Sequence, residues 1–249
     1  MAIMNLGLAI PEVLIDINGL PGLTDITVTA DGVRVGALVT HATLQRSAEI
    51  AKHVPLLWQC VPHVAHLAIR NVGTLGGSIA LADPAAEYPA VVLALQATIT
   101  LEGPNGVRDV GADDYFLGLY ETAKAEDELL VAVTFPKVKD SEVMVFDELT
   151  RRRGDYALCG LAAAFDVSGG RIRAARLAYL SMGDTPVLAP EAAAALIGKA
   201  PSEETIAAAL MALVNDLSPR SDLHGSVNGK LHWAKVLFGR SVRQLGKSA

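Results

Sequence analysis

The stretch RNVGTLGGSIALADPAAEYPA, residues Arg70–Ala90, contains three glycines within five positions, Gly73, Gly76 and Gly77. Glycine lets the backbone approach a ligand closely or adopt positive φ, and successive N–H groups can then point into one concavity that binds phosphate oxygens. The alternative is a tight structural turn between two helices, which a glycine cluster alone favours. The glycines do not follow a strand in a βαβ unit, so the stretch is not a Rossmann fingerprint.

The polar residues around these glycines extend the ligand-binding interpretation. Thr74 and Ser78 place hydroxyl donors beside the glycines. Asp83, followed by proline, and Glu87 come next along the chain, and their carboxylates can accept hydrogen bonds from ribose or ribityl hydroxyls. The stretch therefore predicts either a phosphate- and sugar-binding loop or a turn between helices.

Composition limits the class of protein. The chain has 249 residues, a net charge of -6 and 51% hydrophobic residues, so it can bury a large core and does not have the basic balance of a general nucleic-acid binder. No apolar run reaches the ~18 residues of a membrane span, and the start, MAIMNLGLAI, does not have the pattern of a signal peptide. Cys60 and Cys159 suit a reducing compartment, so we expect a cytoplasmic protein.

The first half of the chain predicts mixed helices and strands. Residues 25–39 read as two strands joined by a two-residue Asp31-Gly32 turn of type I′. Residues 40–71 read as helical segments cut at Pro55 and Pro62, and residues 89–97 as a buried helix. A hairpin over residues 97–112, a short irregular or helical piece over 112–123 and a strand over 127–136 complete this half.

The polar segment KVKDSE, residues 137–142, marks a domain boundary, which we place between residues 1–138 and 139–249. Beyond it, residues 142–150, 156–167 and 171–182 predict a three-stranded antiparallel sheet, with a hairpin at Ser168-Gly169-Gly170. Two helices follow, the first capped by Ser202 with acids in its first turn. The predicted fold class is α+β.

Metal and catalytic motifs are weak. Cys60, His63 and His66 recur at three-residue spacing, so a metal site is possible, but no clear fourth ligand follows and packing is the default interpretation. No catalytic triad or dyad stands out, and we name no catalytic residue and no metal ligand. The basic run Arg151–Arg153 is either a solvated turn or a surface for a partner or an anionic ligand.

Several stretches follow a known family pattern in order: MNLGLAIPEVLIDI, VRVGALVTHATL, IRNVGTLGGSIALADPAAE, DELLVAVTFP, RRRGDYALCGLAAAF and HGSVNGKLHWAKVLFGRSV. Over essentially its full length, the chain resembles the FAD-binding medium subunit of molybdenum hydroxylases, the family of carbon monoxide dehydrogenase medium chains and xanthine dehydrogenase flavin domains. The most specific part is Arg70–Glu87, where Arg-Asn, Thr-x-Gly-Gly-Ser, Asp-Pro and a later acid all occur. Glu87 stands where the family often has aspartate.

The resemblance implies a role for each matching position. Thr74, Leu75, Gly76, Gly77 and Ser78 would wrap the FAD phosphates. Asp83 and Glu87 would bind ribityl or ribose hydroxyls, and Leu129 would lie against the flavin or the adenine. Tyr156 would shield one face of the isoalloxazine, a role that suits an aromatic ring.

The resemblance also implies electron transfer rather than substrate hydroxylation. A large partner subunit would hold the molybdenum cofactor, and a small partner with [2Fe-2S] clusters would pass electrons to FAD, in a dimer of heterotrimers. The acceptor would be a quinone, oxygen or NAD. Two cysteines cannot supply the four thiolates of a cluster, so the iron–sulfur centres are expected on the partner. The alternatives are a structural subunit that has lost FAD and a stand-alone flavin reductase.

The sequence departs from the family pattern in the first lobe, the N-terminal part of the FAD-binding domain. Family members begin with several tens of further residues, which end in a second glycine-rich loop of the type Ala-Gly-Gly-x-Ser that also holds the pyrophosphate. The present sequence starts after that loop. The predicted FAD-binding domain therefore has a truncated first lobe, either because the true start lies upstream of Met1 or because the protein is a natural short form. In the second case the strand VLIDI, residues 13–17, would leave apolar surface uncovered.

Overall fold

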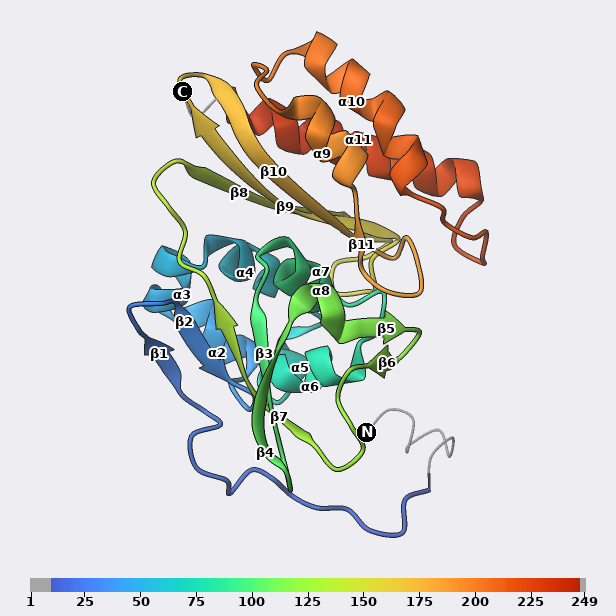
Figure 1. The fold of residues 1–249 in the computed structure, drawn as a ribbon. Helices are drawn as coiled ribbons and strands as arrows, with labels where there is room; N and C mark the ends of the chain where they lie inside the picture. The colour runs from blue at the N-terminus through green and yellow to red at the C-terminus, as the bar shows by residue number, and fades with distance from the viewer. Residues whose placement is uncertain (1–9, 247–249) are drawn as a thin grey trace.

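The computed structural model describes residues 10–246, which form two antiparallel sheets with helices packed around and between them (Figure 1). The start of the chain is not expected to be a signal peptide, and its residues 1–9 lie outside the part that the structure describes. Among the described residues, no helix is both long and apolar enough to cross a membrane. The α+β class expected from the sequence is confirmed.

The first sheet has five strands in the order β1-β2-β7-β3-β4, with every neighbouring pair antiparallel. Its strands are β1 (Ile26–Val28), β2 (Val33–Gly36), β3 (Thr98–Gly103), β4 (Gly106–Gly111) and β7 (Leu129–Phe135). A two-stranded hairpin of β5 (Phe116–Gly118) and β6 (Glu121–Thr122) stands apart from it.

Short helices fill the connections of this first half. They are α2 (His41–Arg46), α3 (Ala48–His53), α4 (Pro55–Cys60), the 3-10 turn η1 (Val61–His63), α5 (Leu67–Arg70), α6 (Leu75–Leu81), α7 (Glu87–Ala94) and α8 (Ala112–Tyr115). Pro55 and Pro62 lie in the first turns of α4 and η1, so the predicted helix breaks at these prolines are confirmed.

The second sheet has four strands in the order β11-β10-β9-β8, not the predicted three. The long strands β8 (Glu142–Leu149), β9 (Cys159–Ser168) and β10 (Arg171–Leu180) lie where the sequence places them. The additional strand β11 (Val187–Leu188) has only two residues, too few to show an alternating pattern, and it is defined by its pairing with β10. The helices α9 (Pro190–Leu196), α10 (Glu203–Asp216) and α11 (Val227–Leu245) follow.

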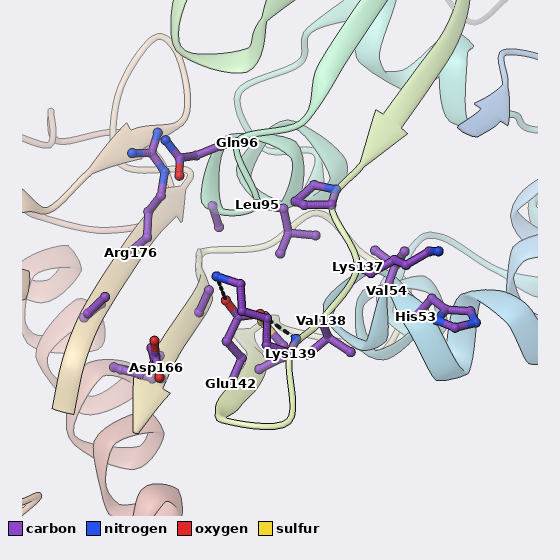
Figure 2. A pocket seen from close by; sticks show the side chains of 17 residues that line it. His53, Val54, Leu95, Gln96, Lys137, Val138, Lys139, Glu142, Asp166 and Arg176 are labelled. Carbon is purple, nitrogen blue, oxygen red and sulfur yellow. Dashed lines mark hydrogen bonds and ion pairs between the residues drawn. The ribbon is translucent and has the colours of Figure 1, made fainter. Parts of the chain in front are cut away.

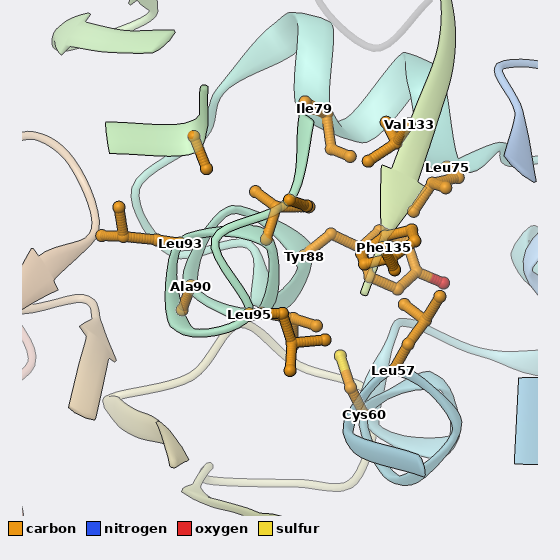
Figure 3. Close-up of a cluster of buried hydrophobic side chains, with 14 of the residues drawn as sticks. Leu57, Cys60, Leu75, Ile79, Tyr88, Ala90, Leu93, Leu95, Val133 and Phe135 are labelled. Carbon is orange, nitrogen blue, oxygen red and sulfur yellow. The ribbon is translucent and has the colours of Figure 1, made fainter. Parts of the chain in front are cut away.

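The second sheet separates two groups of helices. In Figure 1, α9, α10 and α11 cover one of its faces, while α4 and α7 lie against the other. Beneath it, side chains from α4, α6, α7 and β7 meet in one apolar cluster, which includes Leu57, Cys60, Ile79, Tyr88 and Phe135 (Figure 3). The second sheet thus packs on helices of the first half as well as on its own.

Two glycine hairpins illustrate how far turn chemistry predicts geometry. Gly169 and Gly170 have φ of 60° and 68° and join β9 to β10 as a two-residue turn, as predicted. The β1–β2 turn is different: the Thr29 N–H donates to the Gly32 carbonyl at 2.8 Å, so the central residues are Ala30 and Asp31. Gly32 does not have positive φ; a Cβ there would lie 2.4 Å from the Phe135 carbonyl oxygen, which explains the glycine by packing.

Residues 13–17 do not form the predicted strand. They have no regular structure, and Val13, Leu14 and Ile15 are exposed. The short irregular or helical piece predicted over residues 112–123 contains the helix α8 followed by the hairpin of β5 and β6. The strands β5 and β6 have only three and two residues, too few to show an alternating pattern.

The N-cap role of Ser202 at the start of α10 can be tested by substitution. The Ser202 hydroxyl accepts a hydrogen bond from the Thr205 N–H at 3.2 Å. Replacing Ser202 by alanine should lower the free energy of unfolding by about 1 kcal/mol, and replacing it by glycine should cost only a few tenths. Urea denaturation of both variants measures the difference; equal costs would contradict the capping role.

Candidate functional site

The glycine loop connects α5 to α6. Thr74 is the N-cap of α6, and its hydroxyl accepts the Gly77 N–H at 3.1 Å. The Leu75 and Gly76 N–H groups donate to the Val39 and Ala37 carbonyls at 3.0 and 2.9 Å. The Ser78 N–H donates to the Thr74 carbonyl at 3.2 Å. These N–H groups therefore have acceptors within the protein, and they do not form the open nest that the glycines suggest.

The structure gives different reasons for the presence of glycine at positions 73, 76 and 77. A Cβ on Gly73 would lie 2.6 Å from His41 Nε2, and one on Gly76 would lie 2.7 Å from Ala37 Cα. Those two glycines allow close packing of the loop on the chain around His41. Gly77 is exposed, and a Cβ there would meet only the Thr74 hydroxyl oxygen, at 2.9 Å. Of the three, Gly77 is the one that presents bare backbone to solvent.

His41 supports the loop from beneath. Its Nδ1 lies 2.9 Å from the Tyr88 hydroxyl, and its ring is buried. Burial, reinforced by the Arg70 guanidinium, lowers the pKa of His41 to about 4. His41 is therefore a neutral, hydrogen-bonded packing residue.

Asp83 lies in the loop between α6 and α7 and is held by two contacts. Its Oδ1 accepts the Ala85 N–H at 2.9 Å, and the Tyr120 hydroxyl lies 3.4 Å from Oδ2. The next residue, Pro84, accepts the Ser181 N–H at 2.8 Å, so the end of β10 fastens this loop. We call residues 83–86 the acidic loop.

The acidic loop opens on the largest cavity described, of about 1040 Å³, between the two halves of the chain. Tyr156 and Tyr120 also line it, and they are 68% and 56% exposed. The remaining walls come from the ends of the second sheet and from the segment between α10 and α11. A cavity of this size accommodates a drug- or cofactor-sized ligand.

Two ion pairs lie among the charged groups around this cavity. Lys230 Nζ lies 2.5 Å from Asp222 Oδ2, and Arg220 lies 3.3 Å from Asp184. The Lys230 pair lowers the pKa of Asp222 to about 2. Arg151, from the exposed basic run, also lines the cavity, so one of the two interpretations of that run, proximity to a ligand site, keeps structural support.

The predicted site residues fall into four places. Thr74, Leu75, Gly76, Gly77 and Ser78 form the start of α6, and Asp83 and Tyr156 line the large cavity. Glu87 is 7% exposed and is not among the cavity residues. Leu129 begins β7, opposite Glu102 of β3, and is likewise not a cavity residue. Tyr120 is a cavity residue that the sequence did not single out, because nothing local in GLYETA distinguishes it.

The Cys60, His63 and His66 spacing does not produce a cluster. Cys60 belongs to the buried core, and His63 contacts Glu148. Among residues 10–246, no group of three or more histidine, cysteine, aspartate or glutamate side chains is placed to hold a metal ion.

A second cavity, of about 420 Å³, lies where β7 leads into β8. Figure 2 shows Lys139 and Glu142 paired at its rim, 3.4 Å apart, with His53, Gln96 and Arg176 around it. None of the predicted site residues lines it, so the larger cavity is the candidate site.

Comparison with known proteins assigns this architecture to a class. Residues 1–138 match the family described as the FAD binding domain in molybdopterin dehydrogenase, and residues 144–245 match the CO dehydrogenase flavoprotein C-terminal domain. The protein is therefore a flavoprotein-type chain of the oxidoreductase class. It belongs to the family of FAD-binding medium subunits of molybdenum hydroxylases, as the sequence resemblance indicates.

Relatives and solved structures agree. The chain is 37% identical over 246 residues to the nicotine 6-hydroxylase medium subunit of Paenarthrobacter nicotinovorans, covering 99% of this chain and 86% of the relative. It superposes on a chain of carbon monoxide dehydrogenase from Hydrogenophaga pseudoflava with a TM-score of 0.94 and 36% identity, covering 97% and 84% of the two chains. Quinoline 2-oxidoreductase from Pseudomonas putida 86 gives 0.94 and 38%, covering 100% and 86%.

The residues present fit FAD. Gly77 is exposed at the start of α6, and the acidic loop that follows the end of α6 presents the Asp83 carboxylate to a cavity of cofactor size. Exposed aromatic rings on the cavity wall suit a flat ring system.

The glycines give a test that separates packing from binding. Gly76→Ala should lower the free energy of unfolding by roughly 1–3 kcal/mol, because the new Cβ overlaps Ala37. Gly77→Ala should change stability by no more than about 1 kcal/mol and weaken FAD binding roughly tenfold. Thermal unfolding and fluorescence titration with FAD measure the two effects. Equal behaviour of the two variants would contradict the division.

Proposed function

We propose that this chain is the FAD-carrying electron-transfer subunit of a multi-subunit molybdenum hydroxylase. The observation that carries the proposal is the cavity between the two halves, because the acidic loop and Tyr156 both line it. The match to the two flavoprotein family domains supports it. FAD, when bound, supplies the redox chemistry, and the protein supplies binding and orientation.

The chain's own residues would divide the work of binding. The start of α6, Thr74–Ser78, would approach the phosphates through Gly77 and the hydroxyls of Thr74 and Ser78. Asp83 would accept hydrogen bonds from ribityl or ribose hydroxyls. Tyr156 would pack on the flavin ring and restrict its access to solvent. For Leu129 and Glu87 the family roles remain proposals, and Glu87 requires a rearrangement because its side chain is buried.

The partners are part of the proposal. We assign the molybdenum cofactor to a large subunit and the [2Fe-2S] clusters to a small one, in a cytoplasmic dimer of heterotrimers whose substrate is oxidised on the large subunit. The relatives' names, such as carbon monoxide dehydrogenase medium chain, support a multi-subunit setting. We also propose that the functional domains are residues 1–138 and 139–249.

A structural subunit without FAD is the second candidate. It is favoured by one observation: Gly73 and Gly76 are explained by packing against His41 and Ala37, without reference to a ligand. Under this alternative the large cavity would be a feature of the interface alone.

The decisive experiment is spectroscopic. The purified complex should show a flavin absorbance band that bleaches when its substrate is added, because electrons arrive at the flavin. A complex with stoichiometric subunits and no flavin would exclude the first candidate and leave the second.

Asp83 provides a residue-level prediction. Asp83→Asn removes the charge and one acceptor at the acidic loop, so FAD should bind about tenfold more weakly, the effect of one lost hydrogen bond to a charged group. Fluorescence of released FAD on dilution measures the change. Asp140→Asn, at an exposed position of the linker, is the matched control and should bind FAD as the wild type does.

A further inference from the structure

Arg70, the first residue of the glycine-rich stretch, has a side chain that the proposed binding roles do not use. Its Nη1 donates to three backbone carbonyls, those of Pro62 at 3.4 Å, Val64 at 3.0 Å and Ala65 at 2.8 Å. All three carbonyls belong to residues 61–66, a segment that we call the supporting turn. One cation therefore holds several carbonyls of this turn together, and hydrogen bonds from a charged donor are the stronger kind.

The supporting turn contains a residue in an unfavourable backbone conformation. Ala65 has a φ of 46°, in the left-handed region that a residue with a Cβ adopts at a cost. Arg70 also leaves a donor unused, because its Nε is buried and has no hydrogen-bond partner among the described residues. The position of the guanidinium therefore matches the carbonyls of the turn rather than all of its own donors.

The supporting turn lies against the loop that leads from β8 to β9, residues 150–158, which we call the tyrosine loop because it contains Tyr156. Gly154 in this loop has a φ of 87°. A Cβ there would lie 2.6 Å from His66 Nδ1 and 3.0 Å from the Ala65 carbonyl oxygen. The backbone of the loop is thus in close contact with the turn at Gly154, two residues before Tyr156.

A second contact joins the supporting turn to the strand from which the tyrosine loop begins. His63 Nδ1 lies 3.1 Å from Glu148 Oε1, and the His63 ring makes an edge contact with Phe146, with centroids 5.1 Å apart. Both partners lie on β8, whose last residue, Leu149, precedes the loop. The turn therefore touches the second half of the chain on β8 and again at Gly154.

We propose that Arg70 is a positioning residue for Tyr156. Arg70 fixes the carbonyls of the supporting turn, the turn seats the tyrosine loop through Gly154, and the loop presents Tyr156 to the large cavity. Arg70 is not among the residues that line this cavity, so it acts through the turn and the loop. The inference rests on the proposed function insofar as the ligand of the cavity is FAD.

The far end of the tyrosine loop is fixed independently of Arg70. The Leu158 N–H donates to the last carbonyl of β8 at 2.7 Å, and the Ser181 hydroxyl donates to the Ala157 carbonyl at 2.6 Å. These contacts lie within the second half, so loss of Arg70 should not unfold the loop. It should release the loop from the first half and let Tyr156 move in the cavity.

The test compares Arg70→Met, which keeps a long stem without donors, with Gly154→Ala, which pushes the loop off the turn. Arg46→Met, at an exposed position of α2, is the matched control. The reporter is the Asp155 N–H, which donates within the tyrosine loop at 3.1 Å. Its hydrogen exchange should be about tenfold faster in Arg70→Met, the effect of one lost hydrogen bond to a charged group. Exchange in α9, α10 and α11 should stay at the wild-type rate, and Arg46→Met should match the wild type throughout.

A double variant separates positioning from general destabilisation. If Arg70 acts on the loop through Gly154, the two substitutions break one contact, so together they should speed Asp155 exchange little more than either does alone. Effects that multiply, or a wild-type Asp155 rate in Arg70→Met, would overturn the proposal. Should Arg70→Met fail to fold, His66→Ala at an exposed position removes the ring against which Gly154 packs and should speed Asp155 exchange; an unchanged rate there would also overturn it.

Bound FAD provides a spectroscopic measurement. With Tyr156 displaced, iodide should quench flavin fluorescence more strongly in Arg70→Met than in Arg46→Met, because less of the flavin ring is covered. Equal quenching in the two variants would overturn the link from the loop to Tyr156. A protein that binds no FAD would refute the proposed function, while the exchange rate of Asp155 would still decide whether Arg70 positions the loop.

Discussion

The structure depends on one helix, α7, that has no solvent-exposed face. All eight residues of α7, Glu87–Ala94, are buried. A helix that is apolar all round must be enclosed on every side. The enclosure comes from both halves of the chain: α4, α6 and α8 contact α7 from the first half, and β9, β10 and β11 contact it from the second. The two halves are therefore held together by the burial of α7 rather than by a flexible linker.

Enclosing α7 brings backbone polar groups of the second sheet into the interface, and side chains of the first half satisfy them. Gln59 donates to the Met144 carbonyl at 3.0 Å and accepts the Phe146 N–H at 3.1 Å, so it pairs with the outer edge of β8 like a short strand. The reverse arrangement also occurs: Arg176 of β10, a side chain of the second half, donates to the Leu93 carbonyl of the first half at 2.8 Å. At the end of the interface the packing opens into the large cavity, and the acidic loop marks that transition.

The sequence predicted most of what local chemistry controls. The capped start of α10, the Gly169-Gly170 turn and the apolar run of α7 each follow from a few neighbouring residues, and all are present. The strand β11 escaped prediction because it has only two residues, and the β1–β2 turn centres on Ala30 and Asp31 rather than on the Asp-Gly pair. The glycine loop was hard to predict for another reason, since its N–H groups donate to the carbonyls of Ala37 and Val39, some forty residues earlier. Of the predicted site residues, Asp83 and Tyr156 line one cavity while Glu87 and Leu129 do not, and the role of each in binding stays a prediction.

Gly73 and Gly76 have a consequence for how such chains drift during evolution. Both are required by contacts with His41 and Ala37, so selection for folding alone would retain them in a descendant that had ceased to carry a flavin. Gly77 and Asp83 have no comparable restraint from the core: one is exposed and the other faces the cavity. Among related sequences, erosion at these two positions with the other glycines intact would therefore identify the members that have become purely architectural.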